Sequence, residues 1–261
     1  MSYRLSQFKF KTLRTINYFK YRPKSVLFDH IPKCAGSTIN HFLTQFYSPK
    51  VTYYMGGVTY KEAVIEFTTF DEKKRFSYRL IIGHWANKLR HKVAKNTKMI
   101  TVLRDPVDRI ISHYYYVKRV KSHFLHDAVV NNNVSLKDYC CLNLSNELEN
   151  QYTQHFSGLS LEDVKNKNEI AVEMAYKNLI ENYSLVGFQE NISAFIGSFL
   201  KLMNLPQKFS YIKSQNITQK RPKIEEIDQE TLASIHTHNS LDLMLFKKLL
   251  ASKNPVIIND Y

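Results

Sequence analysis

The stretch at residues 26–40 constrains the fold most, because an apolar run of strand length is followed at once by small residues and then by a helix-forming segment. The apolar run breaks at Pro32, and residues 37–46 are predicted to form a helix. A strand, a tight turn and a helix in this order aim backbone N–H groups and the helix N-terminus at an anion. The stretch therefore predicts an anion-binding turn.

The residue order in this turn differs from that of the Walker A phosphate loop. There, Lys stands next to Ser or Thr after two glycines, whereas here Lys33 precedes the glycine of the turn, Gly36. Lys33 supplies a mobile ammonium group, and Ser37 and Thr38 supply hydroxyl donors. This arrangement suits a 5′-phosphate that bears a further anionic group, and it lacks the residue placement that binds magnesium in the Walker loop.

A second apolar strand is predicted at residues 99–103, and Arg104 follows it directly. Pro106 suits the first turn of a helix predicted at residues 106–119, and Ser112 lies two turns along that helix. Because a guanidinium group is a planar fork for phosphate oxygens, Arg104 and Ser112 are predicted to hold one phosphate. Two phosphate sites after two strands imply a ligand with two separated phosphates.

These two stretches resemble the paired motifs of the sulfotransferases that use 3′-phosphoadenosine-5′-phosphosulfate (PAPS). Residues 30–38 resemble the loop for the 5′-phosphosulfate, and residues 103–116 resemble the motif for the 3′-phosphate. The chain is similar to the heparan sulfate 2-O-sulfotransferase-like branch of the carbohydrate sulfotransferases over most of its length, about residues 25–250. Three later stretches are also similar, at residues 149–158, 175–190 and 216–221.

The resemblance implies transfer of a sulfuryl group from PAPS to a hydroxyl group of a saccharide or polysaccharide. His84, which follows a predicted strand and a glycine, is the expected general base, and Lys33 is expected to stabilise the leaving phosphate. The expected PAPS-binding residues are Lys33, Ala35, Gly36, Ser37, Thr38, Arg104, Ser112, Thr218, Lys220 and Arg221. The expected acceptor-binding residues are His30, Trp85, Lys88 and Arg119, and no metal is expected.

Two positions depart from the heparan 2-O branch. That branch carries an arginine three residues before the loop lysine, where this chain has His30. It also carries a second histidine two residues before the catalytic one, where this chain has Ile82. Both positions face the acceptor in that branch, so the resemblance leaves the identity of the saccharide open.

The formal charge of +14, from 37 Lys and Arg against 23 Asp and Glu, favours polyanionic partners. No motif of a nucleic-acid-binding module is present in the sequence, so no nucleic-acid partner is expected. The resemblance implies a saccharide or polysaccharide acceptor, and the charge of the chain favours an anionic one. The three cysteines, with one adjacent pair, do not form a disulfide framework and favour a reducing compartment. With no transmembrane or signal segment in the sequence, a cytoplasmic location is expected.

Strands that alternate with helices predict an α/β fold, with a mostly parallel central sheet, helices on both faces and a P-loop-like core. Two domains are predicted: a basic amphipathic segment at residues 1–24 and a sulfotransferase domain at residues 25–261. The basic segment suits either packing on the domain or peripheral contact with an anionic membrane. Further strands are predicted at 79–84 and 184–188, helices at 59–70, 170–180, 193–203 and 228–251, helical pieces within 120–168, a turn at 55–57 and a polar loop at 206–223.

The sequence leaves two other functions open, a nucleotide kinase or NTPase and a non-enzymatic binding protein. A nucleotide kinase or NTPase with an altered loop needs an acidic metal ligand, and Asp105 is the nearest, although its place before Pro106 suits helix capping better. A non-enzymatic binder of nucleic acid or anionic membrane would act through residues 1–24. The binder leaves both phosphate motifs unexplained.

Overall fold

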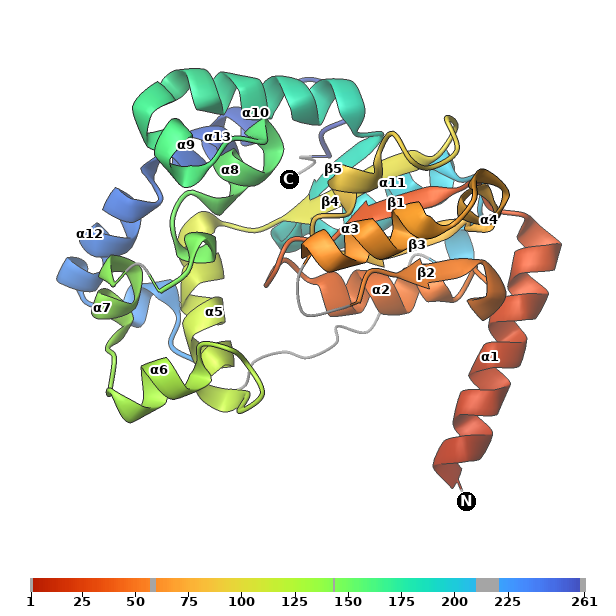
Figure 1. Ribbon diagram of the computed structural model, residues 1–261, viewed down its shortest axis with the longest axis horizontal. Helices are drawn as coiled ribbons and strands as arrows, with labels where there is room; N and C mark the ends of the chain where they lie inside the picture. Colours follow the sequence, from red (N-terminus) through yellow and green to blue (C-terminus); the bar gives the residue numbers. More distant parts are fainter. Residues whose placement is uncertain (1, 57–59, 143, 210–220, 259–261) are drawn as a thin grey trace. The chain divides into compact units, whose positions relative to one another are not determined.

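The computed structural model describes residues 2–56, 60–142, 144–209 and 221–258, without the side chains of residues 2–8 and 60. The chain divides into two compact units. The sheet unit comprises Met1–Leu103, Tyr183–Asn216 and Ile258–Tyr261, and the helical unit comprises Arg104–Asn182 and Ile217–Ile257 (Figure 1). The boundary predicted after residue 24 stays a prediction.

The sheet unit is built on a five-stranded sheet in the order β2-β3-β1-β4-β5. Each strand runs parallel to its neighbours. The strands are β1 (Val26–Asp29), β2 (Thr52–Tyr54), β3 (Leu80–Gly83), β4 (Lys98–Leu103) and β5 (Leu185–Phe188). The predicted α/β class and parallel sheet are therefore confirmed, as are the four strands predicted from apolar runs.

The core of the sheet unit explains why these short apolar runs are strands. Every residue of β1, β3 and β5 is buried, as expected for a parallel sheet between helices. Two helices, α2 (Gly36–Thr44) and α11 (Ile192–Leu202), contribute aromatic and branched side chains to one hydrophobic cluster with strand residues. This packing fixes the carboxyl end of β1 next to the N-terminus of α2.

The remaining helices of the sheet unit are short or peripheral. They are α1 (Ser2–Tyr21), α3 (Tyr60–Thr69) and α4 (Glu72–Ser77), with single turns of 3₁₀-helix η1 (Pro49–Val51), η2 (Ala86–Leu89), η4 (Gln189–Asn191) and η5 (Gln207–Phe209). The predicted helices at 37–46, 59–70 and 193–203 match α2, α3 and α11 within a few residues at each end. The last residue of the predicted turn at 55–57 lies outside the described residues.

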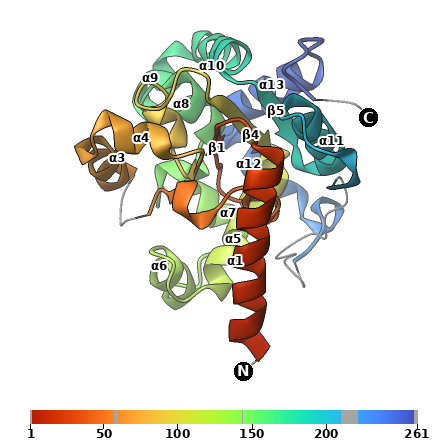
Figure 2. The ribbon, with the colours of Figure 1, turned by 90° about the vertical axis from the view of Figure 1, so that its right-hand side faces the viewer.

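Helix α1 forms the basic N-terminal segment, and its N-terminal end extends away from the sheet (Figures 1 and 2). It attaches to the sheet unit through Arg14, whose Nε donates to the Tyr47 carbonyl at 3.0 Å, and through Asn17, whose side chain donates to the Gln45 carbonyl at 2.9 Å. The apolar face of this helix includes Leu13, Ile16 and Phe19, which are 48, 55 and 67% exposed. Contact of this face with a membrane stays a prediction.

The helical unit contains no strand among its described residues. Its helices are α5 (Pro106–Arg119), α6 (His126–Asn131), α7 (Leu136–Cys141), α8 (Gln151–Ser157), α9 (Leu161–Lys167), α10 (Glu169–Asn182), α12 (Gln229–His238) and α13 (Ser240–Leu250), with 3₁₀ turns η3 (Asn146–Leu148) and η6 (Ile224–Glu226). The helix predicted at 106–119 is α5 with the same bounds, and residues 120–168 are helical in pieces, as predicted.

The prediction of one long helix at residues 228–251 is wrong, because two helices, α12 and α13, occupy this region and meet at Asn239. Asn239 is fully buried, and its side-chain amide donates to the carbonyls of Leu148 and Ile235 at 3.1 and 3.2 Å. Its Oδ1 accepts the Asn150 N–H at 3.3 Å. These bonds to a distant loop favour a non-helical backbone at Asn239, which periodicity does not reveal.

No helix in the described part of the chain is long and apolar enough to cross a membrane. All three cysteines, each among the described residues, carry thiols rather than disulfide bonds. Cys34 and Cys140 are buried, and Cys141 is exposed.

Candidate active site

The turn after β1 has the geometry of an anion-binding loop. Lys33 and Ala35 adopt left-handed backbone conformations, with φ of 67° and 57°. Such conformations are unfavourable for residues other than glycine and are concentrated at ligand-binding sites. Successive left- and right-handed residues also turn backbone N–H groups into one concavity. Cys34 fills the inside of the turn, and its Sγ donates to the Pro32 carbonyl at 3.6 Å.

Helix α2 begins at Gly36, so its first amide groups face this turn. The N–H groups of Gly36 and Ser37 lie in the first helical turn and have no intrahelical acceptor by geometry. The N–H of Thr38 differs, because it donates to the Ala35 carbonyl at 3.0 Å. Of the predicted phosphate donors, the Gly36 and Ser37 amides are therefore better placed than the Thr38 amide.

His30 lies against this turn. A Cβ atom on Gly36 would come within 1.5 Å of the His30 Nε2, so the imidazole ring occupies the space that a side chain at residue 36 would need. The ring also stacks on Phe28, with centroids 5.5 Å apart and planes 15° apart. Burial, and then the charges of His84 and Lys33, lower the pKa of the His30 imidazole well below its ordinary value. His30 is therefore neutral at physiological pH.

His84 follows β3 as His30 follows β1. These strands pair in parallel, with Asp29 opposite Gly83, so both histidines emerge at the same edge of the sheet. The ring centroids are 4.4 Å apart, and the Nδ1 of His84 lies 2.6 Å from the backbone carbonyl oxygen of His30. Because a carbonyl only accepts, Nδ1 must carry the proton. The neutral ring therefore keeps its lone pair on Nε2, and the side chain is exposed.

Asp29, which the sequence did not single out, anchors this edge of the sheet. Its side chain is fully buried and accepts the Tyr183 hydroxyl at 2.5 Å and the Asn87 N–H at 3.3 Å. Its carbonyl accepts the Thr101 hydroxyl at 2.9 Å. Burial and then the Asp29 charge raise the pKa of Tyr183 well above its ordinary value, so its hydroxyl remains the donor. These bonds tie the end of β1 to the segment after His84.

Trp85 and Lys88 lie directly after His84. Trp85 is partly buried, with a left-handed backbone at φ 61°, and it precedes the 3₁₀ turn η2. The Lys88 ammonium lies 5.8 Å from the Trp85 ring centroid, at cation–π distance, and the lysine is exposed. Their predicted contacts with an acceptor stay predictions.

In the helical unit, the predicted 3′-phosphate motif forms the start of α5. Asp105 is the N-cap, and its Oδ1 accepts the Asp108 N–H at 2.9 Å, which confirms the capping role. The Arg104 backbone is held from both sides by Tyr152, whose hydroxyl accepts the Arg104 N–H at 3.2 Å and donates to the Arg104 carbonyl at 2.8 Å. Ser112 is buried on α5, one turn after Asp108.

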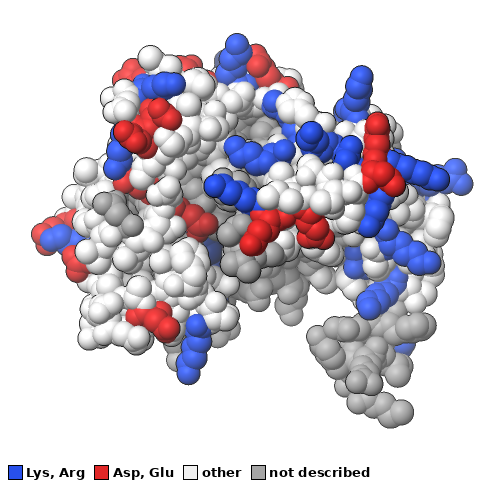
Figure 3. Space-filling model, in the orientation of Figure 1, with Lys and Arg blue, Asp and Glu red and all other residues white. Residues whose placement is uncertain are grey.

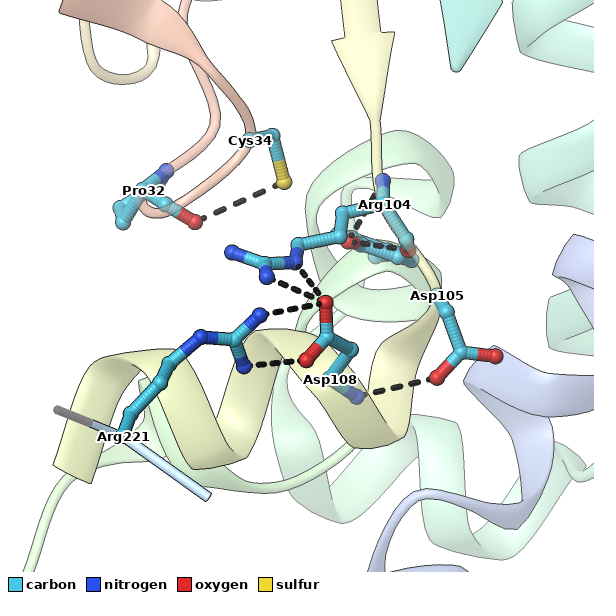
Figure 4. A network of polar contacts seen from close by, with 7 residues as sticks. Pro32, Cys34, Arg104, Asp105, Asp108 and Arg221 are labelled. Carbon is cyan, nitrogen blue, oxygen red and sulfur yellow. Dashed lines mark hydrogen bonds and ion pairs between the residues drawn. The ribbon is translucent and has the colours of Figure 1, made fainter. Parts of the chain in front are cut away.

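The Asp108 carboxylate joins Arg104, which was predicted to hold the 3′-phosphate, to Arg221, which was expected among the PAPS-binding residues. It forms ion pairs with Arg104 and with Arg221, and both guanidinium groups point at it (Figure 4). Burial alone would raise the pKa of Asp108, but the hydrogen bonds and charges of Arg221 and Arg104 outweigh it and hold the pKa below its ordinary value. The spacing of Asp108 four residues after Arg104 was the available signal for this contact.

Three further residues of this half were predicted to bind PAPS or the acceptor. Arg119 is exposed in the last turn of α5. Thr218 and Lys220 lie outside the described residues. Among the residues that the structure describes, no three His, Cys, Asp or Glu side chains are grouped so that they could hold a metal ion.

A comparison with protein families decides the class of protein. The sequence profile described as "Sulfotransferase family" matches residues 17–248, which is most of the chain and runs through both units. The chain belongs to the sulfotransferase family. Membership of this family supports the conclusion that the protein is a transferase that moves a sulfuryl group. A search of curated proteins gave no match to this chain.

Proposed function

We propose that this sulfotransferase moves the sulfuryl group of PAPS to a hydroxyl group of a saccharide or polysaccharide. One observation carries the proposal. Within the sheet unit, His84 is held through its Nδ1 by the carbonyl of His30, the residue that opens the anion-binding turn. This contact, with the exposed imidazole of His84 beside the turn that we assign to the 5′-phosphosulfate, supports a role for His84 as general base.

The residues present fit PAPS. The turn offers the Lys33 ammonium group and the first backbone amides of α2, and we assign these groups to the 5′-phosphosulfate. The guanidinium group of Arg104, just before α5, and the hydroxyl group of Ser112, on α5, are assigned to the 3′-phosphate. Arg221 is assigned to the 3′-phosphate as a second guanidinium group. PAPS supplies a sulfuryl group already activated by its anhydride bond to phosphate.

His84 and Lys33 would divide the chemistry. The Nε2 of His84 takes the proton of the acceptor hydroxyl as its oxygen attacks, and the bond from Nδ1–H to the His30 carbonyl holds the ring in place and stabilises the imidazolium. The Lys33 ammonium offsets the negative charge that develops on the bridging oxygen as the phosphate leaves. Neither role needs a metal ion.

An anionic acceptor suits the charge of the protein. Lys and Arg side chains gather at the right of Figure 3, where Figure 1 places α1 and α4, and the chain carries a formal charge of +14. Trp85 is proposed as a surface for a sugar ring, and Lys88, Arg119 and His30 as further acceptor contacts. Because all three cysteines are thiols, we propose that the enzyme works in a reducing compartment, the cytoplasm.

Transfer of ³⁵S from labelled PAPS to a panel of neutral and anionic polysaccharides tests the proposal. Label should appear in at least one polysaccharide with the wild-type protein. His84→Ala and Lys33→Ala should each lower the rate about 10²-fold or more. Lys50→Ala, which removes an exposed lysine of the same unit, should leave the rate unchanged. Absence of transfer to any hydroxyl acceptor, together with hydrolysis of ATP, would overturn the proposal.

A further inference from the structure

The Asp108 carboxylate is surrounded by the guanidinium groups of two arginines that lie far apart in the sequence. Its Oδ2 accepts from Arg104 Nε at 2.7 Å and from Arg221 Nη2 at 3.1 Å. Two further bonds join Arg104 Nη2 to Oδ2 and Arg221 Nη1 to Oδ1. Arg221 lies 113 residues after Asp108, so this carboxylate ties the segment that begins at Arg221 to helix α5.

The cluster is sheltered and carries excess positive charge. The side chains of Arg104, Asp108 and Arg221 are 7, 18 and 23% exposed, so water and salt screen their charges less than at the surface. Two guanidinium groups share one carboxylate, which leaves one net positive charge. An anion such as phosphate is therefore still attracted to the cluster while the carboxylate is in place.

We propose that Asp108 is a positioning residue that holds Arg104 and Arg221 together as one phosphate-binding unit for the 3′-phosphate. The inference rests on the proposed function, because that function assigns the two arginines to the 3′-phosphate. Without the carboxylate, the two guanidinium groups repel each other and each long side chain samples many rotamers. Ordering them when the nucleotide binds would then subtract from the affinity.

Whether removal of Asp108 weakens or strengthens binding of the 3′-phosphate shows whether its carboxylate positions the arginines or competes with the phosphate. If Asp108 merely occupied the place of the phosphate, its removal would free both arginines and strengthen binding of the 3′-phosphate. If Asp108 positions the arginines, its removal weakens that binding. Asn is isosteric with Asp but has one acceptor oxygen and no charge, so Asp108→Asn cannot hold four N–H donors from two guanidinium groups.

The test compares dissociation constants for adenosine 3′,5′-bisphosphate and adenosine 5′-monophosphate, measured by calorimetry on the full chain. The ratio of the two constants reports the 3′-phosphate alone. Asp108→Asn should lower this preference about tenfold and change binding of the monophosphate less than about twofold. Asp108→Glu keeps the carboxylate and should retain part of the preference. Glu173→Gln, which removes an exposed ion pair with Lys248 in the same unit, should change neither constant.

Each outcome decides between the possibilities. An unchanged or increased preference in Asp108→Asn overturns the positioning role. Equal weakening of both ligands in Asp108→Asn and Asp108→Glu also overturns it, because this assigns Asp108 to general stability. If the asparagine variant does not fold, the same comparison is made with Asp108→Glu. A preference for the 3′-phosphate below that of the wild type supports the positioning role, and an unchanged or increased preference overturns it. A wild-type protein that binds both nucleotides equally refutes the proposed function itself, before any variant is compared.

Discussion

His84 donates its Nδ1 proton to the backbone carbonyl of His30 across 2.6 Å, and this bond selects the tautomer with a basic Nε2. A carbonyl acceptor holds the ring without adding a charge. His84→Ala should therefore lower kcat about 10²–10⁴-fold and leave the affinity for adenosine 3′,5′-bisphosphate unchanged. Steady-state kinetics and calorimetry measure the two quantities. His91→Ala is the control, since it removes another exposed histidine of the sheet unit and should leave kcat unchanged.

Gly36 leaves room for the His30 ring. A methyl group at residue 36 would meet the His30 Nε2 at 1.5 Å, so Gly36→Ala must displace the ring or the turn. The cost should be about 1–3 kcal/mol of unfolding free energy, measured by urea denaturation. Gly56→Ala is a matched control, because a Cβ there meets nothing within 4 Å. Equal stabilities of the two variants would contradict the observed packing.

His30 should make the stability depend on pH. Its pKa is lowered in the folded state, first by burial and then by the charges of His84 and Lys33. Below about pH 6.5 the unfolded chain binds a proton that the folded chain does not, so this histidine lowers stability as pH falls. His30→Phe keeps an aromatic ring and removes the titration. The stability of wild type relative to this variant should decline from pH 7 to 5, and parallel curves would refute the prediction.

Asp242 should be a large contributor to the stability of the helical unit. This fully buried carboxylate accepts the N–H groups of Tyr152 and Thr153 at 2.9 and 2.8 Å, and the Thr153 hydroxyl at 2.9 Å. Asp242→Asn turns an amide donor toward these donors and should cost about 1–3 kcal/mol. Asp228→Asn, at the exposed cap of α12, should cost less in the same denaturation experiment. A larger loss at Asp228 would show that burial does not set the cost.

The sequence predicted the parts of the fold whose signals are local. The strand and helix around Gly36, and the strand and helix around Arg104, combine apolar runs with turn and cap residues, and each formed as predicted. The short edge strand β2 was not predicted, although Thr52 and Tyr53 are typical strand residues, because its three residues are too few for a pattern. The break at Asn239 depends on bonds to Leu148 and Asn150, which lie far away in the sequence.

In the candidate site, too, the sequence predicted the residues that a local signal marks and missed those whose partners lie far away in the chain. His84, Lys33 and Arg104 were found because a motif or a strand end marks them. Asp29 was missed, because its partner Tyr183 lies 154 residues away and no local pattern links them. The spacing of four residues between Arg104 and Asp108 is visible in the sequence, but no role was predicted for Asp108. Its contact with Arg221 can be recognised only in the folded chain. The roles assigned to these side chains stay predictions.

The central claim is that this sulfotransferase uses PAPS, and the melting temperature with nucleotide tests it most directly. A ligand that binds the folded state alone raises the melting temperature by mass action. The account predicts a rise with adenosine 3′,5′-bisphosphate that disappears in Arg104→Ala, and no comparable rise with magnesium and ATP. A rise with magnesium and ATP alone would contradict the account and favour a nucleotide kinase.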